Sequence, residues 1–365
     1  MLRFHPLRVV DVRPEAEDAV ELSLDVPEAL RSTFQALPGQ HIVLRAQVAG
    51  AEERRTYSLV NAPGEWPLRI AVRVHEGGRM SGYLSRELRP GDTIDVLPPN
   101  GSFTPRVPPS SGGLYVGIAA GCGITPISGI ARAVLAASPS SRFELFYGNR
   151  NTARTMLLED LFALKDRYLG RLALHFFMSR EPQEAEIYNG RLDGEKVRTL
   201  AQSLLDVPSV TEWFVCGPGT MCVDVPEALR ALGVAPERIH VERFTVESGD
   251  EASRQAGEPA RAAASAGDDS EATAEVTIVM DGRRRTFTMR MDGQTVLDAA
   301  AQAGIELPFS CKAGVCSTCR TKVVRGEVEM LQNYALEDWE VEQGYVLACQ
   351  SKVKSRELEL DYDER

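Results

Sequence analysis

The sequence lacks an excess of positive charge. Its 365 residues carry 41 Lys and Arg against 52 Asp and Glu, which gives a formal net charge of -11. Nucleic acid phosphates call for clustered Lys and Arg. The one compact basic run, Arg283 to Arg285, follows an Asp-Gly turn signal and is interpreted as a hairpin rim, with a small docking patch as the alternative. Nucleic acid is therefore excluded as a partner.

The sequence also lacks an apolar segment suited to secretion or to a membrane. Its first residues, MLRFHPLRVVDVRP, have neither the apolar core nor the small-residue cleavage site of a signal peptide. The most apolar window, LYVGIAAGCGITPISGIA, contains glycines and a proline that suit a strand, a turn and a helix better than a membrane span. We expect a soluble cytoplasmic protein, whose seven cysteines stay reduced rather than forming disulfides.

What the chain does contain is a series of stretches that differ in the pattern of their apolar residues. Residues 1–110 hold short β-branched runs between Pro, Gly and Asn signals, with one helical segment near 80–88, which predicts an antiparallel β-barrel. Residues 111–245 alternate apolar strands with amphipathic helices, which predicts an α/β domain with a parallel sheet. Residues 246–273 are rich in Ala, Ser, Gly and acid, which predicts a flexible linker or a frayed helix. Residues 274–365 form the last predicted domain.

This last domain opens on a hairpin around Asp-Gly and a helix in QTVLDAAAQAG, and a cysteine loop follows. The cysteines have the spacing C-x4-C-x2-C, and one more lies in YVLACQS. A zinc site usually offers two separated pairs, whereas this spacing is typical of a plant-type 2Fe-2S centre. Gly314 and other small residues let backbone N–H groups approach the sulfurs. The predicted ligands, with zinc as the alternative metal, are Cys311, Cys316, Cys319 and Cys349.

A 2Fe-2S centre takes one electron at a time, so a hydride donor needs a two-electron adapter, and the first stretch offers a flavin site. In RRTYSLV, Arg55 is a candidate for a flavin phosphate, Tyr57 for stacking on the ring and Ser58 for a hydrogen bond to N5. In GGRMSGYL, Gly78 and Ser81 lie where a helix begins, and a helix N-terminus favours a pyrophosphate. An ordinary strand and an ordinary turn remain the alternatives.

The second stretch offers a nicotinamide site, although its glycine loop departs from the G-x-G-x-x-G fingerprint. In GCGITP, glycines between a strand and a helix permit close backbone approach, and the candidates there are Gly121, Gly123, Thr125 and Pro126. In CGPGTM, Cys216, Gly217 and Pro218 lie where a nicotinamide would bind, with the thiol near the carbon that loses hydride. A buried cysteine without a role is the alternative.

These motifs occur in the order found in the ferredoxin-NADP reductase superfamily, in its arrangement with a C-terminal ferredoxin, which the chain resembles. The stretches FHPLRV, PGQHIVLRA, YGNRN, GRLDGEKV, IHVERF and NYALEDWEVEQGYVLACQ are further similar to the reductase subunits of phenylacetyl-CoA epoxidases. The resemblance covers nearly the full length apart from the linker. It implies an FAD-binding barrel, an NADPH-binding lobe and an α+β ferredoxin-like (β-grasp) 2Fe-2S domain. It also implies that electrons pass from NADPH to a di-iron oxygenase partner in phenylacetate catabolism.

The resemblance further assigns residues. It places Ser58 and Cys216 at the site of hydride transfer. It makes Ser179 and Arg180, which follow the third strand of the α/β domain, selectors for the 2′-phosphate of NADPH, because Arg binds a phosphate by bidentate, charge-assisted bonds. Arg150 in YGNRN is a second candidate for that phosphate.

One aromatic residue is assigned near the end of the α/β domain. Phe244 in VERF is expected either to cover the flavin face or to anchor a domain boundary.

Two other functions remain open at this point. One is a reductase for another aromatic or hydrocarbon mono- or dioxygenase, with NADH or FMN in place of NADPH or FAD. The other is a redox-sensing or scaffold subunit, which predicts that NADPH leaves the flavin unbleached. No acid–base triad is recognised, and none is needed, because the cofactors carry the chemistry. The linker is expected to let the ferredoxin domain move between flavin and partner.

Overall fold

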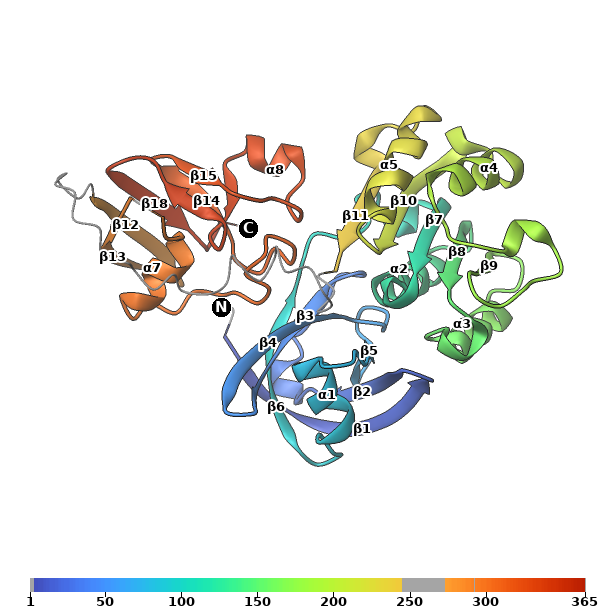
Figure 1. The fold of residues 1–365 in the computed structure, drawn as a ribbon, viewed down its shortest axis with the longest axis horizontal. Helices are drawn as coiled ribbons and strands as arrows, with labels where there is room; N and C mark the ends of the chain where they lie inside the picture. Colours follow the sequence, from blue (N-terminus) through green and yellow to red (C-terminus); the bar gives the residue numbers. More distant parts are fainter. Residues whose placement is uncertain (1–2, 245–272, 292, 365) are drawn as a thin grey trace. The chain divides into compact units, whose positions relative to one another are not determined.

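The computed structural model describes residues 3–244, 273–291 and 293–364. These residues fall into two compact units, one spanning Phe4–Phe244 and the other containing the residues after it (Figure 1). The segments predicted as the first two domains lie together in the first unit. The predicted linker at 246–273 lies outside the described residues except for Thr273, which begins a strand.

The first unit begins with the predicted antiparallel β-barrel. Its strands pair in the order β4-β3-β6-β1-β2-β5, and an antiparallel bridge between Leu59 and Ile70 joins the two edges of the sheet. Alternate side chains such as Ile42 and Leu44 fill the interior. The elements are β1 (His5–Ala16), β2 (Ala19–Asp25), β3 (His41–Val48), β4 (Ala51–Ser58), β5 (Leu68–Arg73), α1 (Arg79–Arg86) and β6 (Thr93–Asn100).

The rest of the first unit is the predicted α/β fold around a parallel sheet of order β11-β10-β7-β8-β9. Its strands are β7 (Gly113–Ala120), β8 (Ser141–Asn149), β9 (Leu172–Met178), β10 (Val210–Gly217) and β11 (Ile239–Arg243). Four of them coincide with predicted strands, whereas β11 was not predicted as a strand. It lies at an edge and pairs in parallel with β10.

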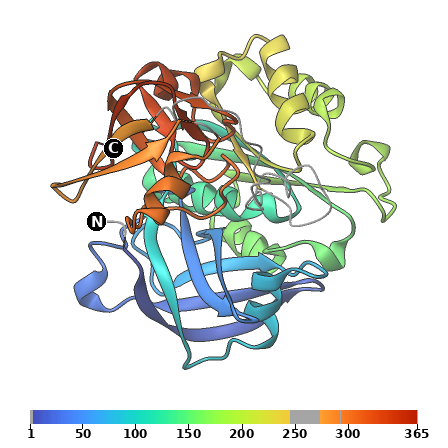
Figure 2. The ribbon, with the colours of Figure 1, turned by 60° about the vertical axis from the view of Figure 1, so that its left-hand side comes forward.

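Helices cover both faces of this sheet (Figures 1 and 2). They are α2 (Ile124–Ala137), α3 (Leu158–Arg167), α4 (Gly194–Leu204) and α5 (Met221–Ala231). Side chains of β7 alternate between the two cores: Tyr115 packs on the side of α2 and α3, whereas Val116 and Ile118 pack on the side of α4 and α5. Because the strands are parallel, the loops after their carboxyl ends share one edge, which is where such sheets bind ligands.

The second unit has a mixed sheet of order β13-β12-β18-β14-β16 and a small β15-β17 ladder. Its elements are β12 (Thr273–Met280), β13 (Arg283–Arg290), α7 (Val296–Gln302), β14 (Arg320–Arg325), β15 (Val328–Met330), α8 (Asp338–Glu342), β16 (Tyr345–Leu347), β17 (Ser351–Val353) and β18 (Glu357–Asp361). This strand and helix content agrees with the predicted α+β class. None of the helices in the described segments has the length and apolar character that a membrane crossing requires.

Local sequence signals explain how this second unit begins. Asp281 and Gly282 both adopt positive φ, 57° and 67°, as a tight turn between β12 and β13 requires. The Thr295 side chain caps α7 by accepting a hydrogen bond from the Asp298 amide at 3.3 Å. Gly304, with φ of 73°, follows the helix end. The hairpin, the cap and the stop were all predicted from sequence.

Candidate functional site

Two arginines at one end of the barrel are held by a shared carboxylate. Glu53 is buried on β4 and pairs with Arg55 at 3.1 Å and with Arg79, the first residue of α1, at 3.0 Å. Arg55 also donates to the carbonyl of Arg54 at 2.7 Å. The pairing fixes two guanidinium groups beside the start of α1, which suits an anionic ligand. Sequence reasoning missed Glu53, although its position two residues before Arg55 places both on one face of the strand.

Ser58 carries the clearest sign that the barrel binds a ligand. Its hydroxyl is buried, and no hydrogen-bond partner for it exists among the described residues. A buried polar atom of this kind is expected to be satisfied by a group that is not part of the chain. The neighbouring Tyr57 is partly buried against the barrel core. The residues therefore fit the flavin predicted from the sequence.

The predicted helix start near Gly78 is present. Gly78 is the N-cap residue of α1 and is itself buried. The Ser81 hydroxyl accepts a hydrogen bond from the His75 amide at 3.3 Å, so it already supports the preceding turn. Gly77 has φ of 73° and open space around its Cα. The open position is therefore Gly77, next to the N-cap, whereas the Gly78 amide already donates to the His75 carbonyl at 3.0 Å.

The glycine loop after β7 lies directly against the end of β10. A Cβ atom at Gly123 would lie 2.0 Å from the carbonyl oxygen of Cys216, so only glycine fits there. Gly121 has φ of 56° and no atom within 4 Å of a Cβ built on it. The Thr125 hydroxyl donates to the Cys122 carbonyl at 3.0 Å and closes the first turn of α2, which also contains the buried Pro126.

Cys216 is buried at the carboxyl end of β10. This position at the end of the fourth strand of the sheet was predicted from the sequence. Burial and then the negative charge of Glu242 raise the pKa of the Cys216 thiol well above its usual value. The side chain is therefore a neutral thiol, which suits a hydrophobic contact rather than nucleophilic attack. Gly217 packs tightly, since a Cβ there would lie 2.7 Å from Met221, and Pro218 is exposed in the loop that follows.

Arginines gather at the carboxyl edge of β8 and β9. The Arg180 amide donates to the carbonyl of Arg150 at 2.8 Å, and both side chains are exposed. Ser179 anchors this loop through its amide and its hydroxyl, which donate to the Asn149 carbonyl at 2.9 and 3.2 Å. The positive charge of Arg154, then slight burial and the positive charge of Arg180, lower the pKa of Arg150. The structure thus brings these arginines together at one positively charged edge of the sheet, which suits a phosphate.

The last strand of the sheet returns to the barrel. Phe244 follows β11 and packs, partly buried, against the core between sheet and barrel. Two residues earlier, Glu242 lies 3.8 Å from His41 of β3, measured from Oε1 to Nδ1. Neither His41 nor Glu242 was predicted as a site residue, because their contact exists only once β11 has joined the sheet.

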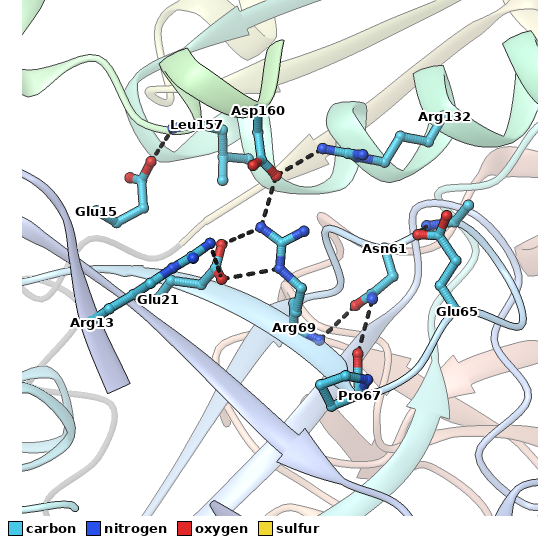
Figure 3. Close-up of polar contacts among 11 residues, drawn as sticks. Arg13, Glu15, Glu21, Asn61, Glu65, Pro67, Arg69, Arg132, Leu157 and Asp160 are labelled. Carbon is cyan, nitrogen blue, oxygen red and sulfur yellow. Dashed lines mark hydrogen bonds and ion pairs between the residues drawn. The ribbon is translucent and has the colours of Figure 1, made fainter. Parts of the chain in front are cut away.

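A partly buried ion-pair network joins the barrel to the α/β fold (Figure 3). Arg69 of β5 donates to both carboxylate oxygens of Glu21, at 3.0 and 2.5 Å, and to Asp160 of α3 at 2.7 Å. Arg13 reaches the same Glu21 at 2.8 Å, and Arg132 of α2 reaches Asp160 at 2.7 Å. The network therefore links the barrel and the α/β fold, which carry the two predicted cofactor sites, within one compact unit. Sequence reasoning missed this network.

In the second unit, three of the predicted ligand cysteines lie in one loop whose backbone is bent around them. Lys312, Gly314 and Ser317 all adopt positive φ, at 53°, 71° and 49°. This geometry turns the amides of Ala313 and Val315 toward the sulfur of Cys311, at 3.3 and 3.5 Å. Such hydrogen bonds stabilise a thiolate and tune the potential of an iron–sulfur centre.

The cysteines meet as two pairs. The neighbouring Cys316 and the loop amides lower the pKa of Cys311. The neighbouring Cys319 likewise lowers the pKa of Cys349. Within the described ranges, no group of three or more His, Cys, Asp or Glu residues could hold a single metal ion. Two pairs of cysteines suit the two irons of the predicted 2Fe-2S centre.

Comparison with known families matches the whole arrangement. A model described as the oxidoreductase FAD-binding domain matches residues 6–104, the oxidoreductase NAD-binding domain matches residues 118–227, and the 2Fe-2S iron-sulfur cluster binding domain matches residues 278–354. The three matches follow the order of the barrel, the parallel sheet and the cysteine loop.

Two curated relatives are similar along nearly their full length. A subunit of the 1,2-phenylacetyl-CoA epoxidase from Escherichia coli K12 is 39% identical over 365 residues, covering 100% of this chain and 99% of that protein. The ferredoxin reductase component of 3-ketosteroid-9-alpha-monooxygenase from Rhodococcus rhodochrous is 30% identical over 359 residues, covering 98% of this chain and 96% of that protein.

Solved structures share the fold. Phthalate dioxygenase reductase superimposes with a TM-score of 0.58 at 22% identity and 98% coverage of both chains. An intact type IV self-sufficient cytochrome P450 monooxygenase superimposes with a TM-score of 0.68 at 23% identity, covering 98% of this chain and 41% of that one. Both matches extend from the barrel to the cysteine-bearing unit.

Proposed function

Because this chain belongs to the ferredoxin-NADP reductase superfamily, in the 2Fe-2S-containing family that includes the Escherichia coli phenylacetyl-CoA epoxidase subunit, we propose that it supplies electrons from NADPH to a di-iron oxygenase acting on phenylacetyl-CoA. The chain is an oxidoreductase that moves electrons from NAD(P)H through FAD and a 2Fe-2S centre. The observation that carries the narrower proposal is the end-to-end similarity to the Escherichia coli protein at 39% identity.

Residues of the first unit would hold FAD and the nicotinamide. When bound, FAD accepts a hydride and passes electrons singly to the 2Fe-2S centre. Arg55 would bind a flavin phosphate, Ser58 would hydrogen-bond the ring, and the neutral thiol of Cys216 would pack where the nicotinamide lies. The fit of Ser58 is supported by its buried hydroxyl, which finds no partner in the described part of the chain.

We further propose that the loop after β9 selects NADPH over NADH. Arg180 and Arg150 would bind the 2′-phosphate, with Ser179 shaping the loop. The support is the positive charge that accumulates around Arg150 and lowers its pKa. A bound phosphate would offset this charge.

In the second unit, the proposed ligands of the two irons are Cys311 with Cys316 and Cys319 with Cys349. The spacing of these cysteines and the amide hydrogen bonds to the sulfur of Cys311 support this assignment. The proposed domain limits are those predicted from sequence, namely 1–110, 111–245, a linker from 246, and 274–365, except that Thr273 belongs to β12 and moves from the linker to the last domain. We also propose that the protein acts in the cytoplasm, where its thiols stay reduced.

One reconstitution tests the proposed partner. The purified chain, loaded with FAD and iron–sulfur cluster, is combined with the di-iron oxygenase components, NADPH and phenylacetyl-CoA. Oxygen consumption should depend on the CoA thioester and should match product formation. As a control, phenylacetyl-CoA is omitted. Oxygen uptake that is the same with and without the thioester would refute the phenylacetyl-CoA epoxidase assignment.

A second candidate partner is the oxygenase of a steroid-degrading system, favoured by the 30% identity to the ketosteroid monooxygenase reductase component. The same reconstitution separates the two candidates when a 3-ketosteroid and its terminal oxygenase replace phenylacetyl-CoA and the di-iron oxygenase. The oxygenase that is the true partner should reach its half-maximal rate at a lower reductase concentration than the other oxygenase does.

A further inference from the structure

Two hydroxyls of the second unit are buried without a hydrogen bond to any described residue. They are the Oγ atom of Ser310, a residue that is 6% exposed, and the Oη atom of Tyr362, which is 4% exposed. Ser310 directly precedes the proposed ligand Cys311, so its place beside the centre follows from the sequence. Tyr362 comes after the last strand, and only the fold can bring it near the cysteines. A buried phenol of this kind is expected to be satisfied by a group that is not part of the chain.

Alternation along β18 turns the side chain of Tyr362 into the core of the second unit. Leu358 and Leu360 of β18 are buried, and the residues on either side of each are less so. Tyr362 follows two residues later, so its side chain points to the same face of the sheet. All three residues belong to one core cluster, which also contains Cys319 and Cys349. The phenol therefore lies in the same packed interior as one of the two cysteine pairs.

The register of β18 with β14 brings Tyr362 close to Cys319 in particular. Asp361 is opposite Lys322 in this antiparallel pairing. The next pair along the two strands is therefore Tyr362 with Thr321. The Thr321 hydroxyl donates to the Asp361 carbonyl at 2.9 Å, so the strands are still side by side at this point. Cys319 is two residues from Thr321, and diagonal neighbours of this kind on one face of a sheet lie within reach of an aromatic side chain.

The phenol of Tyr362 keeps its proton in this interior. Burial, and then the negative charges of Cys319 and Cys349, raise the pKa of Tyr362 well above its ordinary value. Tyr362 is therefore a hydrogen-bond donor at neutral pH and needs an acceptor. Cysteine sulfurs bind metal as thiolates, whose negative charge makes them hydrogen-bond acceptors.

We propose that the Tyr362 hydroxyl donates a hydrogen bond to the sulfur of Cys319 when the 2Fe-2S centre is bound, and that this bond raises the reduction potential of the centre. The reduced centre carries one more negative charge than the oxidised centre, so a donor to its sulfur stabilises the reduced state more. Electrons from the flavin are thereby drawn toward the centre. The inference rests on the proposed role of Cys319 as a ligand.

The test uses the full chain loaded with FAD and cluster, with the substitution Y362F, which removes the hydroxyl and keeps the ring. The matched control is Y345F. Tyr345 is also buried in the second unit, but it pairs with Lys322 and so lies on the other face of the sheet, under the guanidinium group of Arg320. The reduction potential is measured by a dye-mediated titration that follows the electron paramagnetic resonance signal of the reduced centre.

Y362F should lower the equilibrium constant for reduction of the centre about tenfold, which for one electron is a potential about 59 mV lower. Y345F should leave the potential unchanged. A third protein carries 3-fluorotyrosine in place of Tyr362, and its potential should rise, because the fluorinated phenol is a stronger acid and a stronger donor. A packing defect would not reverse its sign in this way. A potential in Y362F equal to that in Y345F, or a shift of the same sign in Y362F and the fluorinated protein, would overturn the inference.

A second readout reports on the sulfur itself. Resonance Raman spectra of the oxidised protein in H2O and in D2O show which iron–sulfur bonds respond to exchangeable protons. The stretching bands of the bonds between iron and the cysteine sulfurs should shift less on deuteration in Y362F than in the unsubstituted protein, which Y345F should match. Equal isotope shifts in all three proteins would also overturn the inference.

Two outcomes are kept apart from these. If Y362F assembles no cluster, the fluorinated protein carries the test, and an unchanged potential there overturns the inference. If NADPH fails to bleach the flavin of the unsubstituted protein, or if its reduced form gives no signal of a 2Fe-2S centre, the proposed function itself fails.

Discussion

The ion-pair network between barrel and α/β fold allows one prediction to be worked from its geometry: the substitution R69M should strongly destabilise the first unit. Arg69 makes two hydrogen bonds to Glu21, whose side chain is 3% exposed, and one to Asp160, whose side chain is 25% exposed. Methionine keeps an unbranched apolar side chain but removes the guanidinium group and with it all three bonds. Glu21 is left as a buried carboxylate with only Arg13 beside it.

The expected loss follows from burial. Breaking a buried ion pair by removing one partner costs about 3–5 kcal/mol, because a charge stays buried. The lost bond to Asp160 adds about 1 kcal/mol at most, since Asp160 is partly exposed and keeps Arg132. The total of about 4 kcal/mol is a large share of the roughly 5–15 kcal/mol that stabilises a typical fold.

Urea titration measures this loss, with the fluorescence of released FAD reporting on the first unit. The control is R8M, because the pair of Arg8 with Asp25 is exposed at 63% and 46% and should contribute less than about 0.5 kcal/mol. The double substitution E21Q/R69M should recover part of the loss, since the buried charge is gone. An R69M protein within about 1 kcal/mol of R8M would refute the reasoning.

Three further predictions concern the cofactor sites and the pH response. R180A should raise KM for NADPH about tenfold or more and leave KM for NADH unchanged in steady-state assays, because a charge-assisted bond to the 2′-phosphate contributes about 1.5–3 kcal/mol; equal changes for both nucleotides would contradict the assigned role. C316S should lose bound iron and the reduction of cytochrome c while keeping ferricyanide reduction, and C222S should lose neither; an iron content in C316S equal to that of the unsubstituted chain would remove Cys316 from the ligand set. Burial raises the pKa of Glu15 above its ordinary 4.5, so its ionisation opposes folding from about pH 4.5 upward, and fully above the folded-state value; E15Q should therefore increase the free energy of unfolding at pH 7, and the gain should disappear below about pH 4.5, where both states are protonated. A gain that persists unchanged at pH 4 would show that the charge of Glu15 is not its cause.

Structural features that depend on only a few consecutive residues were predictable from the sequence. The hairpin at Asp281-Gly282 needs two residues that tolerate positive φ, and the cap at Thr295 needs a hydroxyl three residues before an amide, so each is visible in a short window. The short β-branched runs between Pro, Gly and Asn signals predicted the barrel strands in the same way. Three of the four proposed ligand cysteines lie within one loop, so their spacing could be recognised without any tertiary structure.

Features that depend on distant segments were missed. The strand β11 is short, and it becomes a strand because β10 offers it a free edge. Glu53 was passed over because a glutamate in a strand is usually exposed, whereas the approach of Arg79 buries this one. The partnership of Arg69 with Glu21 and with Asp160 spans 48 and 91 positions, and no local pattern marks such pairs.

The sequence by itself therefore determined the class of each domain and the order of the FAD-binding, NAD-binding and 2Fe-2S domains, because periodicity and residue spacing act over short range. Only the tertiary structure decided which buried polar groups face one another. Ser58 and His41 meet through strand pairing, and Glu242 reaches His41 after the whole sheet has formed. The physical reason is that burial and charge pairing are properties of segments brought together by folding, and they are set by packing rather than by neighbours along the chain.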